Sequence, residues 1–320
     1  MTMCDWGTLP DGRTAKLITL SNDRLRVNVL SFGAAIQSVH LDDIPHSLTS
    51  GFDHLAPYLR GKGANGCIVG PVANRIGGAQ AMIDGQLHHF DANEAGRTTR
   101  HSGSAGTHLQ LWHPTMVAKT YAELQLPLPD GQGGFPGNRT LIAAFILSEA
   151  TLSLRLSATT DRTTLINLAN HSYWNLGGAP TYAGHRLQIN ADHYLPTHDN
   201  LPTGEIAPVA GTHFDFRTPR DLTPGTDAVL DHNFCLSNTR RPVTDVATLT
   251  GPSGLSMTMA TTEPGLQIYD GANFPGAPYA GLAIEAQSWP DAPNHSIFPS
   301  INLSPDHIYS QTTCWTFGQS

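Results

Sequence analysis

The feature of this sequence that most restricts its fold is the alternation of apolar and polar residues, repeated in short segments along the chain. In residues 151–158, Leu152, Leu154 and Leu156 alternate with polar or charged residues. This two-residue period is typical of a β-strand with one buried face. Residues 255–260 repeat it, whereas no long window keeps the 3.6-residue period of an amphipathic helix.

Glycine and proline separate these segments. The chain has 31 Gly and 23 Pro, spread between the apolar runs, and such punctuation is typical of many tight turns. Residues 25–39 form a β-branched stretch interrupted by Gly33, which predicts two neighbouring strands. A turn at residues 161–163 leads into a further strand that begins at residue 164. We therefore predict an all-β fold, a large antiparallel β-sandwich with few short helices.

No boundary between domains is evident. Residues 127–137 are rich in Gly and Pro, but this segment is short and lies between predicted strands. The chain has no low-complexity segment and no repeat of solenoid length. Since a chain of 320 residues can bury roughly three quarters of its unfolded surface in one core, we expect residues 1–320 to form a single domain.

The charge of the chain excludes several kinds of partner. Lys and Arg number 18 against 26 Asp and Glu, which gives a net charge of −8, and no basic cluster occurs. A nucleic acid would require a positive stripe, and an anionic membrane a polybasic segment. We expect neither as a partner, and instead a neutral small molecule. The sequence leaves open whether the protein is a monomer or a homodimer.

The compartment is indicated by segments that the chain lacks. Its first residues do not combine a basic segment with an apolar one, as a signal peptide would. No apolar run approaches the ~20 residues of a membrane span. The four cysteines show no Cys-x-x-Cys spacing, and a core of this size does not require disulfides. We expect a cytoplasmic protein with reduced thiols.

The sequence predicts neither a metal ion nor another cofactor. The chain has 16 His, but no His-x-x-x-His spacing, and the adjacent His88 and His89 have no third ligand nearby in sequence. Residues 70–78 are rich in small residues but lack the Gly-Lys-Ser/Thr ending of a phosphate loop. The Gly-x-Ser-x-Gly motif of α/β-hydrolases is also absent.

Residues 281–295 contain a carboxylate in an unusually apolar strand. Along this strand Ile284 and Glu285 point to opposite faces. Burying a carboxylate without a partner is costly, so the position needs a reason. One interpretation is a general base beside a bound hydroxyl, and the other is a carboxylate on a solvated face of the sheet.

Residues 167–176 combine amide, imidazole and phenol groups. If this segment is one strand, Asn167, His171 and Tyr173 share a face. These groups suit a sugar because they offer hydroxyl partners and an aromatic surface. Histidine also titrates near neutral pH and can donate and recover a proton. A purely structural histidine is the alternative interpretation.

Three further segments offer polar groups. Arg75 is the only charge among small residues in 70–78, and its forked donors could hold two hydroxyls or orient a carboxylate. His101, Asp231 and His232 complete the candidate residues.

Taken together, these segments resemble the aldose 1-epimerase (galactose mutarotase) family. The matching segments occur in the order of the family and extend over nearly the whole chain. They are ANRI at 73–76, GFPG at 134–137, NHSYWNL at 170–176, PTGEI at 202–206, DHNF at 231–234, EPGLQIY at 263–269, AIEAQ at 283–287, PDAPNH at 290–295 and TCWTF at 313–317.

The resemblance implies a β-sandwich with a sugar bound in an open cleft, and a reaction that interconverts the α and β anomers of a free aldose. It implies that Glu285 is the base that takes the proton of the anomeric hydroxyl. It implies that His171 is the acid that protonates the ring oxygen. The ring then opens, rotation about C1–C2 follows, and the two residues exchange roles as the ring closes on the other face.

The resemblance also assigns residues that bind the sugar. Arg75 and Asp231 match positions that hold sugar hydroxyls, Asn74 and Tyr173 flank them, and Gln267 is a further candidate for the same cleft. His101 corresponds to a second catalytic histidine.

This chain departs from the family pattern at two places near these residues. His101 lies within Arg100-His-Ser-Gly103 where the family usually has Leu-His-Gly-Gly, and Gly70-Pro71 replaces the usual Gly-Arg. The departures bear on which aldose is preferred: a hexose, a pentose or a 6-deoxy sugar.

Two other functions remain as alternatives. One is a sugar-binding or sensing protein of the same fold without the chemistry. The other is a hexose-6-phosphate 1-epimerase, which would require a cluster of cations for the phosphate. The presence of both Glu285 and His171 favours the catalytic function, and the scarcity of cations near the motifs favours a neutral monosaccharide.

Overall fold

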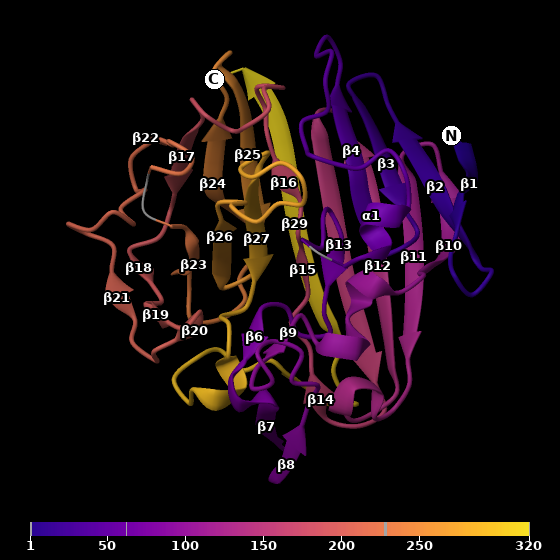
Figure 1. The fold of residues 1–320 in the computed structure, drawn as a ribbon, viewed down its shortest axis with the longest axis vertical. Coiled ribbons are helices and arrows are strands. Elements are labelled where there is room, and N and C mark those ends of the chain that lie inside the picture. Colours follow the sequence, from indigo (N-terminus) through magenta and orange to yellow (C-terminus); the bar gives the residue numbers. More distant parts are fainter. Residues whose placement is uncertain (1, 62, 227–228, 320) are drawn as a thin grey trace.

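The structure, a computed structural model, describes residues 2–61, 63–226 and 229–319. Its named strands form three large sheets and several two-stranded ones, and every paired strand runs antiparallel to its neighbour (Figure 1). This confirms the predicted all-β class. Within the described residues, the single α-helix is α1 (Ala56–Leu59), which has four residues. No helix there is long and apolar enough to cross a membrane.

The largest sheet has nine strands. In spatial order they are β10 (His113–Ala118), β11 (Tyr121–Leu128), β12 (Arg139–Ser148), β13 (Thr151–Thr160), β29 (Tyr309–Gln319), β25 (Leu255–Thr261), β24 (Thr244–Thr250), β17 (Arg186–Ile189) and β22 (Arg220–Asp221). The C-terminal strand β29 therefore pairs with β13 and β25, between the two halves of the sheet.

Two further large sheets have six and four strands. The six-stranded sheet runs β16 (Tyr173–Trp174), β27 (Leu282–Gln287), β26 (Gly265–Tyr269), β23 (Asp231–Cys235), β18 (His193–Tyr194) and β21 (Ala207–Pro208). The four-stranded sheet runs β1 (Thr2–Thr8), β2 (Thr14–Ser21), β3 (Leu25–Leu30) and β4 (Ala35–Leu41). The bend between β3 and β4 falls at the predicted interruption at Gly33, whose φ is 70°.

Short strand pairs and 3₁₀ turns make up the remaining elements. The pairs are β5 (Ile68–Val69) with β15 (Ala169–Asn170), β6 (Arg75–Ile76) with β9 (Thr99–Arg100), β7 (Gln80–Ile83) with β8 (Gln86–His89), β14 (Thr164–Leu165) with β28 (Asn302–Leu303), and β19 (Thr197–His198) with β20 (Leu201–Pro202). The turns are η1 (Gly77–Ala79), η2 (Gly103–Ala105), η3 (Thr107–Leu109), η4 (Gln132–Gly134) and η5 (Ala292–Asn294).

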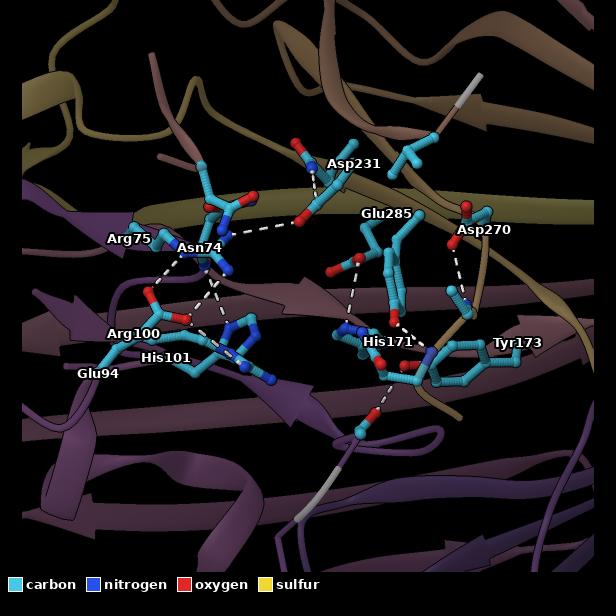
Figure 2. Close-up of a pocket in the computed structure, with 17 residues that line it drawn as sticks. Asn74, Arg75, Glu94, Arg100, His101, His171, Tyr173, Asp231, Asp270 and Glu285 are labelled. Carbon is cyan, nitrogen blue, oxygen red and sulfur yellow. Dashed lines mark hydrogen bonds and ion pairs between the residues drawn. The ribbon is translucent and has the colours of Figure 1, made fainter. Parts of the chain in front are cut away.

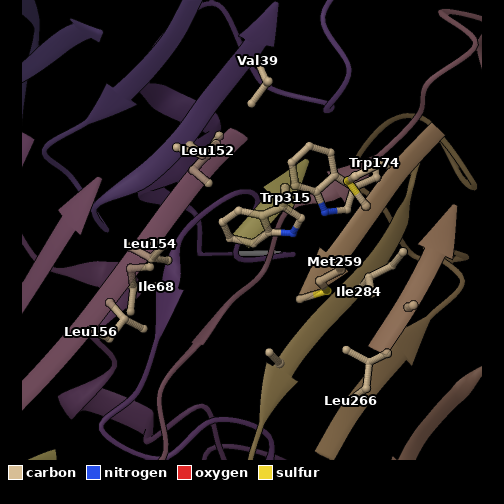
Figure 3. Close-up of a cluster of buried hydrophobic side chains, with 14 of the residues drawn as sticks. Val39, Ile68, Leu152, Leu154, Leu156, Trp174, Met259, Leu266, Ile284 and Trp315 are labelled. Atoms are coloured by element: carbon tan, nitrogen blue, oxygen red, sulfur yellow. The ribbon is translucent and has the colours of Figure 1, made fainter. Parts of the chain in front are cut away.

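The main core forms where the nine-stranded sheet packs against the other two large sheets. The predicted face of β13, with Leu152, Leu154 and Leu156, is buried there, and Ile284 of β27 joins the same cluster from the six-stranded sheet (Figure 3). Trp174 and Trp315 approach each other within this core, with ring centroids 5.6 Å apart. Residues that alternate with the core positions of β26 and β27 therefore face away from the core.

One expectation about the strands is wrong. Residues 167–176 do not form a continuous strand, because the chain leaves β15 after Asn170 and pairs again only in β16 (Tyr173–Trp174). His171 lies in the break between these two short strands. There its backbone N–H donates to Cys67 O and its carbonyl accepts from Gly66 N–H, both at 2.9 Å.

Candidate active site

A cavity of about 340 Å³ opens on the face of the six-stranded sheet that points away from the core. Its wall is formed by Gly63, Asn74, Arg75, Glu94, Arg100, His101, His171, Tyr173, Asn200, Val229, Asp231, Gln267, Tyr269, Asp270, Ala272, Asn273 and Glu285 (Figure 2). The volume suits a small ligand such as a monosaccharide, and most of the wall is polar.

Strand register brings the polar groups of three strands together. In the antiparallel pairing Glu285 lies opposite Gln267, and Gln267 lies opposite Asn233. The neighbouring row contains Asp231 opposite Tyr269. Because side chains alternate along a strand, Ile284 turns to the core while Glu285 turns to the cavity. The two-residue period of β27 therefore places a carboxylate in the pocket.

Glu285 and His171 face each other across the wall of this pocket. His171 Nε2 lies 3.5 Å from Glu285 Oε1, and both side chains are nearly inaccessible to solvent. Burial, reinforced by the negative charge of Asp231, raises the pKa of Glu285 well above 4.5. Burial, reinforced by the positive charge of Arg100, lowers the pKa of His171 to about 3. Both shifts favour the uncharged form of each group.

An aromatic wall continues from His171. The His171 and Tyr173 rings have centroids 5.0 Å apart, and those of Tyr173 and Tyr269 are 6.2 Å apart. The hydroxyl of Tyr173 donates to Gly63 O at 3.1 Å, which fixes the ring. Such rings offer an apolar surface on which the C–H face of a sugar can pack.

A reciprocal pair of contacts holds Asn74 and His101. The backbone N–H of His101 donates to the backbone carbonyl of Asn74 at 2.8 Å, and the backbone N–H of Asn74 donates to the ring nitrogen Nδ1 of His101 at 3.2 Å. Both residues have positive φ, 61° and 47°. Because Nδ1 accepts a hydrogen bond, the proton of the neutral imidazole is on Nε2. Burial, with the charge of Arg100, lowers the pKa of His101 well below 6.5 and keeps the ring neutral.

A network of ion pairs orders the opposite side of the pocket. Arg75 donates to Glu94 twice, from Nε at 2.7 Å and from Nη2 at 3.1 Å. Its Nη1 lies 3.6 Å from Asp231 Oδ2. Asp231 Oδ1 in turn accepts a hydrogen bond of 2.6 Å from Gln267 Nε2. This network orients donors and acceptors around a space that can hold several hydroxyls.

The polar groups that line the pocket are hydrogen-bond donors and acceptors. In the part of the chain that the structure describes, no group of His, Cys, Asp and Glu has the arrangement of a metal site. Two guanidinium groups and four carboxyl groups line the wall, so the lining does not favour a phosphate.

All eight residues to which the resemblance gave a role line the same pocket, although they come from distant segments. They are the predicted catalytic residues His171, Glu285 and His101, and the predicted binding residues Asn74, Arg75, Tyr173, Asp231 and Gln267. Their roles stay predictions. His232, by contrast, is not part of this wall: its Nε2 contacts the Thr197 hydroxyl at 3.3 Å.

Sequence reasoning missed several lining residues. Glu94 and Arg100 flank the Arg75 side of the pocket, and Asp270 lies beside Tyr269 on the other side. A signal for Arg100 was available, since charged residues are scarce in this chain and Arg100 immediately precedes His101. No local pattern distinguishes Glu94 from a solvated loop residue.

The chain is similar to known proteins over nearly its whole length. A sequence model of the aldose 1-epimerase family matches residues 16–315. Human galactose mutarotase is 34% identical over 99% of this chain and 98% of its own length, and the aldose 1-epimerase of Escherichia coli is 30% identical over 96% of each chain. The crystal structure of galactose 1-epimerase from Lactobacillus acidophilus has a TM-score of 0.87 at 29% identity, and covers 100% of this chain and 98% of that one. With this match over nearly its whole length, the chain belongs to the aldose 1-epimerase family.

Proposed function

We propose that the protein is an aldose 1-epimerase that interconverts the α and β anomers of a neutral monosaccharide. The observation that carries the proposal is the buried pair of Glu285 and His171, with 3.5 Å between Oε1 and Nε2, at the wall of a sugar-sized pocket. Opening a hemiacetal requires that one proton leave O1 and that another reach the ring oxygen. A facing carboxylate and imidazole can perform both transfers.

Glu285 and His171 together hold one exchangeable proton, both before and after ring opening. In the reactive arrangement Glu285 is ionised and His171 is protonated. Glu285 takes the proton of the anomeric hydroxyl, His171 gives its proton to the ring oxygen, and the C1–O5 bond breaks. The products are an open aldehyde, a neutral carboxylic acid and a neutral imidazole, so atoms and charge balance.

Burial favours this step. The two pKa shifts mean that the pocket stabilises the uncharged acid and the uncharged imidazole relative to the ion pair. Forming the ion pair costs free energy in the desolvated wall, and ring opening recovers this cost because it converts the ion pair into the uncharged forms. Rotation about C1–C2 then presents the other face of the aldehyde, and the reverse transfers close the ring and restore the ion pair.

The remaining groups bind the sugar in this proposal. Arg75 and Asp231 face the sugar hydroxyls, with Asn74 and Gln267 beside them, and Tyr173 packs against the ring. We assign to His101 a neutral donor at Nε2, directed by the Asn74 contact. The four cysteines are free, which fits the proposed cytoplasmic location.

Polarimetry or NMR of freshly dissolved anomers tests the proposal. Crystalline α-anomers of D-galactose, D-glucose, D-xylose, L-arabinose and L-fucose are followed with and without the protein, with glucose 6-phosphate as the charged control. Acceleration of neutral sugars is expected. If only the phosphate ester reacts faster, the protein is a phosphosugar epimerase. Binding by calorimetry without acceleration of any sugar would make it a sugar-binding protein.

A further inference from the structure

Two arginines, Arg75 and Arg100, line the pocket, and they differ in how many of their N–H donors are hydrogen-bonded to the protein. Arg75 and Arg100 lie directly opposite each other in the pairing of β6 with β9. Two like charges in this position repel. Glu94 relieves the repulsion, since its carboxylate lies against both guanidinium groups.

Arg75 is held by two protein carboxylates. Its Nε and Nη2 donate to Glu94 at 2.7 and 3.1 Å, and its Nη1 lies 3.6 Å from Asp231. Its side chain is 10% exposed. The two Glu94 bonds use two of the five N–H donors of Arg75 and hold its guanidinium in place, so it has fewer donors left for a ligand than Arg100.

Arg100 is the opposite case. Among the described residues, the polar contact that the structure gives its guanidinium is Glu94 Oε1 at 3.7 Å from Nη1, which is longer than a hydrogen bond. The side chain is 42% exposed and nevertheless lines the cavity. A guanidinium has five N–H donors, so most of those of Arg100 are available to a ligand.

The backbone of Arg100 is fixed even though its side chain is not. Its N–H donates to Asn93 Oδ1 at 2.7 Å, and its carbonyl accepts from Asn93 Nδ2 at 3.0 Å. The adjacent turn is closed by two bonds between the backbones of Glu94 and Thr98, at 3.0 and 3.1 Å. Arg100 thus starts from a rigid position beside the pocket and needs to order only its own side chain on binding.

The location of Arg100 indicates which part of a sugar it meets. Figure 2 shows Arg75, Glu94 and Arg100 gathered on one side of the pocket, and Glu285, Tyr173 and Asp270 on the other. If Glu285 meets O1 of the sugar and His171 the ring oxygen, the ring carbons farthest from these two atoms are C3 and C4. The hydroxyls on those carbons then point toward the arginine side.

We propose that Arg100 is a specificity-determining residue that donates hydrogen bonds to the C3 or C4 hydroxyl of the aldose. This inference rests on the proposed function for the orientation of the sugar. Arg100 thereby selects sugars that carry a hydroxyl on the side of the ring away from the anomeric carbon. Hydrogen bonds from a charged donor are worth about 1.5–3 kcal/mol, which corresponds to roughly 10- to 150-fold in affinity.

A double-mutant-type cycle, in which the Arg100 side chain and one sugar hydroxyl are removed separately and together, tests the proposal. Mutarotation of D-galactose, D-glucose and their 2-deoxy, 3-deoxy and 4-deoxy analogues is measured with the wild type and with Arg100→Met, which keeps the length of the side chain. For the parent sugars we expect KM to rise about tenfold or more with little change in kcat. For either the 3-deoxy or the 4-deoxy analogue, wild type and variant should be nearly equal.

A nearby arginine provides the matched control. Arg97 lies in the same loop but is 69% exposed and pairs with Asp199 at 3.3 Å, outside the lining of the cavity. Arg97→Met should leave KM unchanged for every sugar.

Two results would overturn the proposal. One is a loss of the same size for every sugar, including both deoxy analogues, since this would mean that Arg100 acts through its charge on Glu285 and His171 rather than through a sugar hydroxyl. The other is an unchanged KM for all sugars in Arg100→Met.

Failure of the proposed function is distinguishable from failure of this inference. If the wild type accelerates no sugar, the same cycle is measured as Kd by calorimetry. A loss of affinity in Arg100→Met for the parent sugar, absent for one deoxy analogue, would support the inference without the chemistry. Equal Kd values throughout, or no binding of any sugar, would refute it.

Discussion

Two buried glutamates, Glu285 and Glu263, allow the effect of a carboxylate on catalysis to be distinguished from its effect on the stability of the fold. In the described part of the chain, the contact that the structure gives the Glu285 carboxylate is with His171 in the pocket, at 3.5 Å between Oε1 and Nε2. Glu263 is equally buried but accepts from Arg240 Nε at 2.7 Å and from Nη2 at 3.1 Å. It does not line the pocket. The same change, Glu to Gln, should therefore have opposite effects at the two positions.

Glu285→Gln should abolish most of the activity. An amide has the size of the carboxylate but cannot take a proton, so the base of the ring-opening step is lost. General base catalysis typically contributes ~10² to 10⁴ in rate, which corresponds to about 3–5.5 kcal/mol of activation free energy. We expect kcat to fall by this factor, while sugar binding measured by calorimetry changes little.

The stability of Glu285→Gln should not fall with its activity. The folded protein binds the Glu285 proton more tightly than the unfolded chain, because its pKa is raised well above 4.5. The contribution of this group to stability therefore falls as the pH rises from about 4.5 toward the folded-state pKa. Glutamine has no such penalty, so Glu285→Gln should have an equal or higher Tm at pH 7.

Glu263→Gln is the matched control. Replacing this carboxylate removes the charge that Arg240 pairs with, and the loss of hydrogen bonds to a charged group costs about 1.5–3 kcal/mol. We expect a lower Tm and unchanged kcat at a temperature where the variant is folded. Urea unfolding and polarimetry measure the two effects. Near-normal turnover in Glu285→Gln would refute the assignment of the base.

Three further outcomes are expected. Arg75→Ala should raise KM for every neutral aldose at least tenfold, because it removes a donor and frees Glu94 to move; unchanged KM and kcat would exclude it from the site. In Asp231→Asn the alkaline limb of kcat/KM should move to lower pH. Asp231 helps to raise the pKa of Glu285, so without its charge the Glu285–His171 pair loses its one proton more readily. Measuring kcat/KM over a series of pH values tests this, and an unmoved limb would contradict it. Leu154→Ala should cost about 2–5 kcal/mol in urea unfolding, as expected for a buried leucine, with KM unaffected; a loss under 1 kcal/mol would contradict the packing shown for β13.

Much of the fold followed from local alternation. The two-residue period of residues 151–158 predicted β13 and its buried leucines, because alternation along a strand depends only on backbone geometry. The same rule placed Ile284 and Glu285 on opposite faces, and the structure has one in the core and the other in the pocket. Short range suffices for such predictions, since each concerns residues within one strand.

The sequence did not reveal the break in the segment around His171. Alternation predicted a strand through residues 167–176, but β15 and β16 pair with different partners, β5 and β27. The break arises because His171 bonds through its backbone to Cys67 and Gly66, about a hundred positions away. Local propensity carries no information about such partners.

The sequence by itself determined the all-β class, the faces of the principal strands and, through the resemblance to a family, eight residues of one pocket. The tertiary structure alone decided how these residues meet: the 3.5 Å approach of His171 to Glu285, and the position of Glu94 between Arg75 and Arg100. The physical reason is that pKa shifts and unoccupied donors depend on burial and on charges contributed by distant segments. Those segments become neighbours only when the sheets pair and pack.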